Sequence, residues 1–333
     1  MHNGKSDLII AYPPIPFVSA ATDVEIFRQL DALPDHLLGG ALTIGNFDGV
    51  HLGHAAIVQA LKSLAEQYKG AAVVFTFDPH PVRLLRPDQV PPPLTWTNRK
   101  AELLAEQGID AVIASPTDQA LLDLTAEAFF EQIVCKSLRA RAMVEGANFY
   151  FGRDRQGDIP KLQQLCQSQN MDLSIIAPVL IDQQPVSSSR IRRLLAEGDV
   201  AAAAQMLTRP YRLRGMVTHG AGRGVSLGFP TANLEAIDTL IPADGVYGGI
   251  GRANGKQWAA AINIGPNPTF GEMHQKVEVH LIDCSETLYG VPLEVDFVTR
   301  LRDTGKFENA ELLREQLARD VDQVRAWWAP NKS

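Results

Sequence analysis

Short apolar runs alternate with longer amphipathic stretches along the first half of the chain. The apolar runs predict strands, and the stretches between them, where apolar residues recur every three or four positions, predict helices. This order requires crossover connections and therefore predicts a mostly parallel, Rossmann-like α/β sheet with helices on both faces. The strands are expected at residues 41–45, 71–77, 111–114, 142–145 and 173–176, and the helices at residues 53–68, 98–107, 125–136 and 161–169.

The pattern changes after residue 207. Two short helices are expected just before it, at residues 190–195 and 199–207, and short alternating strands punctuated by glycine and proline follow. Such strands predict an antiparallel β-barrel or sandwich. Apolar residues spaced as on one helical face then predict a C-terminal helix at residues 309–328 that packs on this second sheet. The strands are expected at residues 211–218, 245–252, 258–263, 276–282 and 293–297.

A chain of 333 residues is longer than most single domains, and the change of pattern suggests where it divides. We expect an N-terminal extension at residues 1–40, a first domain at residues 41–207 and a second domain at residues 208–330. With 45% hydrophobic and 21% charged residues, the composition is typical of a soluble globular protein. No apolar run is long enough to span a membrane, so no membrane partner is expected.

Charge and cysteine content bear on two further classes of function. The formal net charge of −7 gives no basis for binding the phosphates of nucleic acid, so no nucleic-acid partner is expected. The three cysteines are odd in number and far apart, which argues against a disulfide framework or a zinc site. They are typical of reduced thiols in a cytoplasmic protein. The sequence leaves the oligomeric state undetermined.

The segment Gly45–His54 carries the clearest candidate chemistry. It lies between a predicted strand and a predicted helix, where the sheet of an α/β protein opens onto its ligand crevice. Its glycines allow close approach of the backbone, and the start of the helix favours an anion. His51 and His54 can donate hydrogen bonds to phosphate oxygens. A tight turn without a ligand and a metal-binding histidine pair are the alternatives, and the absence of a cysteine or third histidine nearby disfavours the metal.

Two further segments are expected at the same edge of the sheet. Residues Glu145–Arg153 follow a predicted strand, and Ser187–Arg192 supply hydroxyl groups, free helix N–H groups and the side chains of Arg190 and Arg192. Together these groups suit a polyphosphate that must leave. Taken singly, the second segment is also typical of an ordinary helix cap with a solvated arginine face.

Nine ordered strings carry a resemblance that extends from about residue 42 to residue 328. On these strings the chain resembles the bifunctional prokaryotic riboflavin kinase/FAD synthetase family. The resemblance implies an α/β nucleotidyltransferase domain that transfers adenylyl from ATP to FMN, followed by an antiparallel β-barrel riboflavin kinase domain with a C-terminal helix. The strings are LTIGNFDGVHLGH, VVFTFDPHP, VEGANFYFG, SSSRIRRLLAEGDV, RPYRLRGMVTHG, LGFPTANL, IPADGVYGG, NIGPNPTF and VEVHLIDC.

For the first domain the resemblance implies direct attack of the FMN phosphate on the α-phosphorus of ATP, which gives FAD and pyrophosphate. His51 and His54 would contact the ATP phosphates, and Mg²⁺ would bridge phosphate oxygens with few protein ligands. The family usually has threonine where this chain has Ser189, a change that keeps the hydroxyl. The other nucleotide and phosphate contacts would come from Gly45, Asn46, Gly53, Asn148, Ser188, Ser189, Arg190 and Arg192.

For the second domain the resemblance implies phosphorylation of riboflavin to FMN by ATP. Thr231 and Asn233 would bind ATP and Mg²⁺ beside Gly228, and Glu278 would be the general base for the ribityl hydroxyl. From its alternation with two valines alone, Glu278 is either exposed or within a cleft. The glycine-rich segment 220–224 is expected near the ATP phosphates without opening a helix. Further flavin contacts are expected from Phe77 in the first domain and from Asn263, Phe270 and Arg300 in the second.

Three other functions fit parts of the pattern. A nucleotidyltransferase with a single activity and a class I aminoacyl-tRNA synthetase could both use the histidine turn, but the chain lacks a basic tRNA-binding domain. A flavin-binding carrier or regulator is the non-catalytic alternative. Binding alone has no need of a strand carboxylate such as Glu278, so the side chains present favour an ATP-dependent transferase.

Overall fold

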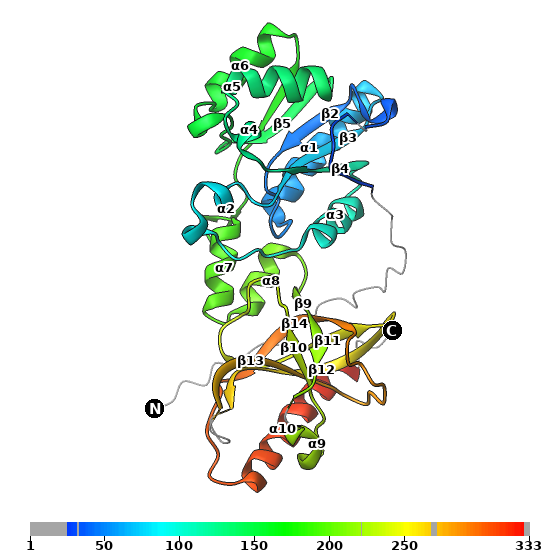
Figure 1. The fold of residues 1–333 in the computed structure, drawn as a ribbon, viewed down its shortest axis with the longest axis vertical. Helices are drawn as coiled ribbons and strands as arrows, with labels where there is room; N and C mark the ends of the chain where they lie inside the picture. Colours follow the sequence, from blue (N-terminus) through cyan, green and yellow to red (C-terminus); the bar gives the residue numbers. More distant parts are fainter. Residues whose placement is uncertain (1–24, 32, 221, 268–271, 330–333) are drawn as a thin grey trace. The chain divides into compact units, whose positions relative to one another are not determined.

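The computed structural model describes residues 25–31, 33–220, 222–267 and 272–329 (Figure 1). This part of the chain divides into two compact units, one up to Arg190 and the other from Ile191 onward. They are called the first and the second unit below. The domain boundary expected at residue 207 stays a prediction. Helix α8 (Val200–Leu207), which ends there, packs on strands of the second unit.

The first unit is built on a six-stranded sheet in which every pair of neighbouring strands is parallel, in the order β1-β4-β3-β2-β5-β6. Side chains alternate between its two faces, so that Leu42 and Ile44 pack in one core while Ala41 packs in the other. The predicted parallel α/β sheet is thus confirmed, and β1 adds a short edge strand. The strands are β1 (Ile26–Phe27), β2 (Ala41–Ile44), β3 (Ala72–Asp78), β4 (Ala111–Pro116), β5 (Ala142–Gly146) and β6 (Asp172–Ile176).

Helices cover both faces of this sheet, as the crossover connections require. Helices α1 (Leu52–Tyr68) and α3 (Thr97–Glu106) bury their apolar sides in one core, and α5 (Ala126–Phe129), the π-helical segment Phe130–Ser137 and α6 (Ile159–Ser168) contribute to the other. The shorter elements of this unit are η1 (Asp35–Leu37), α2 (Val82–Leu85), η2 (Pro87–Gln89), α4 (Gln119–Leu122), η4 (Arg153–Arg155), β7 (Leu180–Ile181) and β8 (Gln184–Pro185). Helix α7 (Ser188–Ala196) spans the division between the units.

The second unit is a closed antiparallel barrel in the order β10-β13-β12-β11-β14-β9, which confirms the barrel rather than the sandwich. Alternate side chains such as Leu213, Ile262 and Val279 are fully buried in its interior. Strand β10 was not predicted. Its elements are β9 (Tyr211–Thr218), α9 (Arg223–Leu227), β10 (Ala232–Glu235), β11 (Gly245–Ala253), β12 (Lys256–Asn267), β13 (Glu272–Leu281) and β14 (Pro292–Arg302).

One expectation about the glycine-rich segment 220–224 was wrong. The segment does open a helix, because α9 begins at Arg223 directly after Gly222. Gly222 has a φ of 71°, in the left-handed region that glycine adopts without steric penalty, and this conformation turns the chain into the helix.

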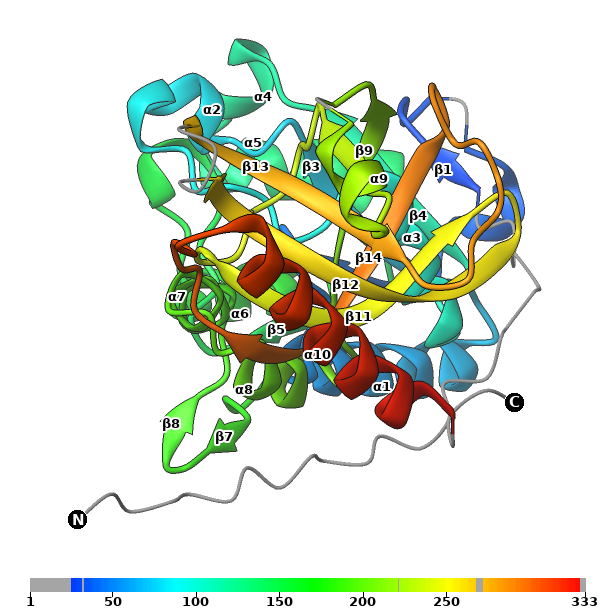
Figure 2. The same ribbon diagram turned by 90° about the horizontal axis from the view of Figure 1, so that it is seen from below.

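Helix α10 (Ala310–Trp328) covers the outer face of the barrel along β11 and β12 (Figure 2). Its Val321 and Val324 pack in a small core with Ala259 of β12. The carboxylate of Asp320, 1% exposed, accepts three hydrogen bonds of 2.8–3.1 Å from the guanidinium of Arg302 in β14. Apolar contact and this buried ion pair together fix the helix on the barrel, which confirms the predicted C-terminal helix.

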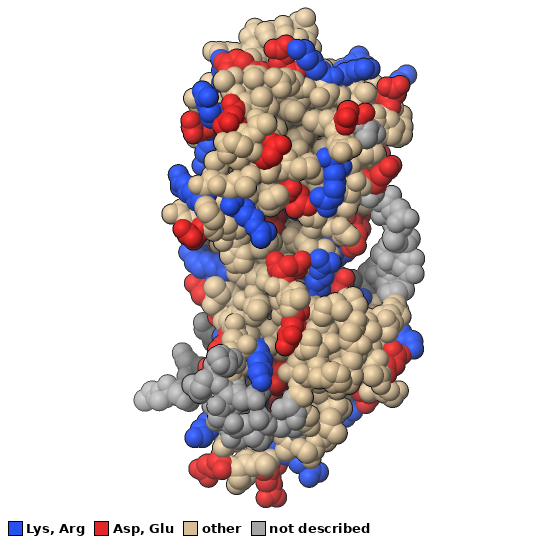
Figure 3. All heavy atoms as spheres, in the orientation of Figure 1, with Lys and Arg blue, Asp and Glu red and all other residues tan. Residues whose placement is uncertain are grey.

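The surface shows no segregation of charge on the face drawn in Figure 3, where basic and acidic side chains are interspersed over the described residues. Among the helices that the structure describes, none combines the length and apolar character needed to cross a bilayer. All three cysteines are free thiols.

Candidate functional site

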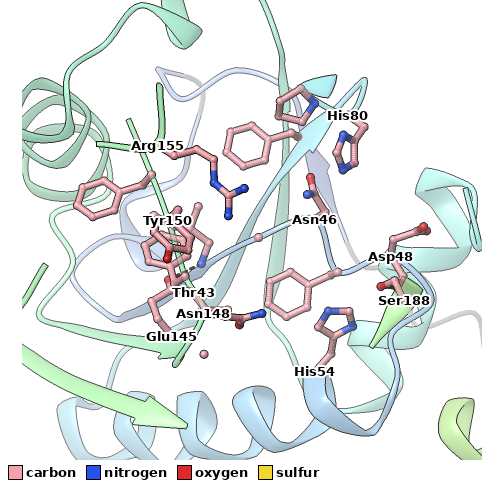
Figure 4. Close-up of a pocket in the computed structure, with 18 of the residues that line it drawn as sticks. Thr43, Asn46, Asp48, His54, His80, Glu145, Asn148, Tyr150, Arg155 and Ser188 are labelled. Atoms are coloured by element: carbon pink, nitrogen blue, oxygen red, sulfur yellow. Dashed lines mark hydrogen bonds between the residues drawn. The ribbon is translucent and has the colours of Figure 1, made fainter. Parts of the chain in front are cut away.

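The strand order of the first unit reverses between β2 and β5, the kind of position at which parallel sheets bind ligands. A cavity of about 1020 Å³ opens there at the carboxyl ends of the strands (Figure 4). Segments that are far apart in the sequence meet in its wall, as their positions after predicted strands indicated. The predicted residues that line it are Gly45, Asn46, His51, Gly53, His54, Phe77, Asn148, Ser188 and Ser189.

The two histidines of the glycine turn lie at the start of α1. His51 is the N-cap residue and is 6% exposed, and its ring stacks on that of His54 with the centroids 3.7 Å apart. The backbone N–H of His51 donates to Nδ1 of His54 over 3.3 Å. Because Nδ1 accepts this hydrogen bond, the neutral His54 ring carries its proton on Nε2. His54 can therefore donate from Nε2 while the helix end holds its ring.

Asp48 ties the glycine turn to two other segments. Its buried carboxylate accepts hydrogen bonds from the backbone N–H groups of Leu94 and Thr95, at 3.0 and 3.1 Å, and from the Thr95 hydroxyl at 3.3 Å. The hydroxyl of Ser188 donates to the backbone carbonyl of Asp48 over 2.8 Å. The glycine turn, the segment before α3 and the first residue of α7 are thereby held together at the cavity.

We expect Asp48→Ala to lower the free energy of unfolding of the first unit by roughly 3 kcal/mol, because two buried N–H groups lose their acceptor. Denaturant unfolding followed by tryptophan fluorescence, to which the nearby buried Trp96 contributes, would measure the change. Asp88→Ala is the matched control, since Asp88 is exposed. Equal unfolding midpoints for the two variants would show that Asp48 does not carry this stability.

Oδ1 of Asn46 and Oγ1 of Thr43, both in the cavity wall, are buried without a hydrogen-bond partner among the described residues. Asn46 was predicted as a site residue, and Thr43 was not. Leaving buried polar atoms unpaired is unfavourable, and such atoms concentrate where a ligand or water supplies the missing partner. Both atoms lie at the carboxyl end of β2, so they favour this edge of the sheet as a binding site.

Arg190 is not among the residues that line the cavity. Its guanidinium donates to the carbonyl oxygens of Ile181 and Gln184 in the β7–β8 hairpin, at 2.9 and 3.0 Å. Its backbone N–H donates to Oγ of Ser187, which makes Ser187 the cap of α7. Arg192 belongs to the second unit. The geometry gives Arg190 a structural role, and a pyrophosphate contact from either arginine stays a prediction.

Several lining side chains were missed by reasoning from the sequence. His80 accepts a hydrogen bond from the Val82 N–H at Nδ1 over 3.1 Å, so its neutral ring also carries the proton on Nε2. The guanidinium of Arg155 lies over the ring of Tyr150, 4.4 Å from its centroid. Of these side chains, only Glu145 could have been noticed in the sequence, because it is an acidic residue near the end of an otherwise apolar predicted strand.

The second unit places three predicted residues in one row across neighbouring strands. Glu278 of β13 pairs in register with Asn233 of β10 on one side and with Asn263 of β12 on the other. Residues paired in this way point to the same face, with Cβ atoms about 5 Å apart. The flanking Val277 and Val279 are 2% and 0% exposed and point into the barrel, so the row lies on its outer face.

The glycine-rich segment 220–224, which leads into α9, packs against this row. A Cβ atom added to Gly220 would overlap the side-chain amide of Asn233, and one added to Gly224 would overlap the carbonyl of Phe229 and lie 3.1 Å from Oγ1 of Thr231. Only glycine at positions 220 and 224 leaves room for the side chains of Asn233 and Thr231. Gly228 ends α9 with a φ of 89°, directly before the segment that carries Thr231.

His280 holds that segment from the other side. It lies two residues after Glu278 in β13, and its Nδ1 is 2.8 Å from the carbonyl oxygen of Pro230. A carbonyl only accepts, so Nδ1 carries the proton and donates. Burial lowers the pKa of His280, partly offset by this hydrogen bond, and keeps the ring neutral near pH 7. The ring thus positions the residue next to Thr231 without adding charge.

The remaining predicted flavin contacts do not gather in this row. Arg300 donates to the carbonyl oxygens of Asp244 and Glu197, at 2.7 and 3.4 Å, and pairs in register with Tyr247. This placement favours a structural role for Arg300. Phe270 lies outside the described residues.

Comparison with known proteins assigns each unit to a family. A family model described as FAD synthetase matches residues 34–190, and one described as riboflavin kinase matches residues 207–328. The chain is 34% identical over 298 residues to the bifunctional riboflavin kinase/FMN adenylyltransferase of Escherichia coli (strain K12), covering 88% of this chain and 94% of that protein. It is 32% identical to the protein of the same name from Haemophilus influenzae, covering 92% and 99%.

A solved structure has the same fold over nearly the whole chain. It is titled as a macrolide-efflux protein from Streptococcus pneumoniae and superposes with a TM-score of 0.80 at 27% identity. The match covers 91% of this chain and 99% of that chain. A fold like that of each unit is therefore found in a chain that has been solved experimentally.

Proposed function

Because the chain belongs to the bifunctional riboflavin kinase/FMN adenylyltransferase family, we propose a site for each of its two reactions. The protein phosphorylates riboflavin to FMN and adenylates FMN to FAD. The cavity of the first unit carries out adenylyl transfer, and the polar row of the second unit carries out phosphorylation. The observation that supports this division most directly is that the FAD synthetase match ends at residue 190, where the first unit ends.

In the first unit, an oxygen of the FMN phosphate attacks the α-phosphorus of ATP, and the bond from that phosphorus to the bridging oxygen of pyrophosphate breaks. No protein nucleophile takes part, so the residues act by positioning and by stabilising charge. His54 donates from Nε2 to the phosphates of ATP, and His51 stacks against it. Asn46 supplies its unpaired Oδ1 and its amide N–H groups to orient the nucleotide, and Asn148 and the α7 hydroxyl groups also contact the phosphates.

In the second unit, the ribityl 5′-hydroxyl of riboflavin attacks the γ-phosphorus of ATP, and ADP leaves. Glu278 accepts the hydroxyl proton as general base. Thr231 and Asn233 bind the nucleotide, and Asn263 lies next to the base on the adjoining strand. The register that brings Asn233, Glu278 and Asn263 together supports this assignment.

Mg²⁺ is the expected companion of ATP in both reactions. Among the described residues, no group of three or more His, Cys, Asp or Glu side chains could hold a metal ion. The oxygens of Thr231 and Asn233 are hard donors, which fits an ion bound mainly by nucleotide phosphates. Mg²⁺ would supply charge neutralisation of the phosphates there. The three free cysteines support a cytoplasmic location for the enzyme.

The experiment that tests both assignments is an incubation of the purified chain with riboflavin, ATP and Mg²⁺, followed by chromatography of the flavins. FMN is expected first and FAD afterwards, and FMN supplied directly is expected to give FAD. FMN without any FAD would remove the adenylyl-transfer site. A single-activity nucleotidyltransferase is not favoured, because it leaves the riboflavin kinase match over residues 207–328 unexplained.

Gly220→Ala tests the close packing around Asn233. The added methyl group overlaps the Asn233 amide, so we expect the kinase rate to fall by about 10-fold or more while adenylylation of FMN stays unchanged. Steady-state assays of each half-reaction would measure the change. Gly305→Ala is the matched control, because its Cβ meets no atom within 4 Å. Kinase rates that fall equally in both variants would show that the Asn233 contact is not the cause.

A further inference from the structure

The adenylyl-transfer cavity contains a buried acid to which none of the steps above gives a role. Glu145 lies at the carboxyl end of β5, lines the cavity and is 2% exposed. The residues before it in β5, Ala142, Met143 and Val144, are 0%, 1% and 0% exposed, so the acid follows an apolar, buried stretch of the strand. An acidic side chain in such a place is uncommon unless it is paired or serves a ligand.

One oxygen of this carboxyl group is used by the fold. Oε1 of Glu145 accepts a hydrogen bond of 2.8 Å from the backbone N–H of Ile44. The register between β2 and β5 ends at the pair Leu42–Met143, so beyond it the strands no longer satisfy each other's backbone groups. Glu145 replaces the missing ladder partner at the point where the two strands separate and the cavity opens.

The other oxygen is left for the cavity. Oε2 makes no hydrogen bond with any described residue, and no cation is paired with Glu145 among them. An isolated carboxylate at this burial is strongly unfavourable. Burial raises the pKa of Glu145 well above its ordinary value, and the Ile44 N–H opposes this shift only in part. Burial without a paired cation thus favours the protonated form of Glu145, in which Oε2 carries an O–H donor.

The position of Glu145 determines which part of a bound ligand this side chain can contact. In the view of Figure 4, Glu145 and Tyr150 lie on one side of the cavity, while His54 and Ser188 lie on the other. By strand alternation Glu145 points to the same face as Met143, whose core includes Phe129. The histidine and serine side suits phosphates, and the aromatic side suits a planar ring.

We propose that Glu145 is a ring-recognition residue of the adenylyl-transfer site, whose Oε2–H donates a hydrogen bond to an acceptor atom of a bound heteroaromatic ring. Both substrates of this site carry such acceptors, as ring nitrogens in adenine and as ring nitrogens or carbonyl oxygens in the flavin. A neutral acid suits them, because it supplies a donor without placing a negative charge beside the phosphates. The inference rests on the proposed location of adenylyl transfer.

Two variants separate the donor from the acid. Glu145→Gln keeps an acceptor for the Ile44 N–H and a donor for the ring, and it cannot ionise. Glu145→Met has similar volume and supplies neither. We expect the Gln variant to bind FMN and an ATP analogue within about 3-fold of the unsubstituted protein, and the Met variant to lose about 10-fold in Kd for one of the two. The substrate whose Kd changes identifies the ring that Glu145 meets.

Infrared difference spectroscopy tests the same contact without relying on the Met variant to fold. The unsubstituted protein should show a carbonyl stretch of a protonated carboxylic acid that is missing in Glu145→Gln and that shifts when one substrate is added. A Met variant that binds both substrates normally, a Gln variant as impaired as Met, or a carboxylic-acid band that neither substrate shifts would each overturn the proposal. Direct binding measurements keep this outcome separate from a failure of FAD formation, which would instead count against the proposed function.

Discussion

We expect His54→Ala to lower the rate of FAD formation from FMN by about 10²- to 10³-fold and to leave the formation of FMN from riboflavin unchanged. The hydrogen bond from the His51 N–H to Nδ1 places the proton of the neutral ring on Nε2, which makes His54 a fixed donor at the helix end. A donor held in this way stabilises charge that builds up on the phosphates without having to reorganise during the reaction. Chromatography of the flavin products in separate assays of each half-reaction gives both rates.

A second substitution separates the role of His54 as a hydrogen-bond donor to phosphate from its role at the helix N-terminus. In His54→Asn the side-chain oxygen can take the place of Nδ1 and accept the His51 N–H, while no donor remains at the position of Nε2. This variant should keep its thermal stability and lose adenylylation as His54→Ala does. The exposed His36 supplies the control, as His36→Ala should change neither rate. Normal FAD formation in His54→Asn would remove the donor role.

The fold could be predicted largely from periodicity, and the exceptions have physical causes. Strands β2 to β6 were recognised because each is an apolar run that pairs on both sides or packs on both faces. Strand β10 (Ala232–Glu235) was not, because only Leu234 of its four residues is buried and its outer side chains are polar. Helix α9 was missed for a different reason. Its five residues include Gly224, and no apolar spacing marks so short a helix.

The candidate sites could be predicted where the residues of a motif lie on one local element. They could be predicted less well where tertiary contacts determine what a side chain binds. His51 and His54 belong to a single helix start, so their spacing alone placed them together. Arg190 looked equally suited to phosphate in the sequence, but its guanidinium is taken by two carbonyls of a hairpin that no local pattern reveals. Glu145 lies within one of the family strings, but the sequence indicated no role for it, because its burial depends on how β2 and β5 separate.

We expect Glu278→Gln to lower the kinase rate by about 10²- to 10⁴-fold and to leave the adenylylation of FMN unchanged. The substitution keeps the size and the hydrogen-bonding capacity of the side chain and removes only its ability to accept the proton of the ribityl hydroxyl. Asn233 and Asn263, which flank Glu278 in the row, should hold the glutamine in the same place. The loss should therefore appear in kcat, with KM for riboflavin and for ATP changed little.

The matched control is Glu235→Gln in the neighbouring strand β10, where the side chain is exposed and lies outside the row. It removes the same charge from the same unit, so a kinase rate that falls equally in both variants would mean that Glu278 acts only through the overall charge of the barrel. A Glu278→Gln variant with an unaltered kinase rate would discard the general base. Loss confined to Glu278→Gln, together with normal conversion of FMN to FAD, would place proton transfer in the row formed by β10, β13 and β12.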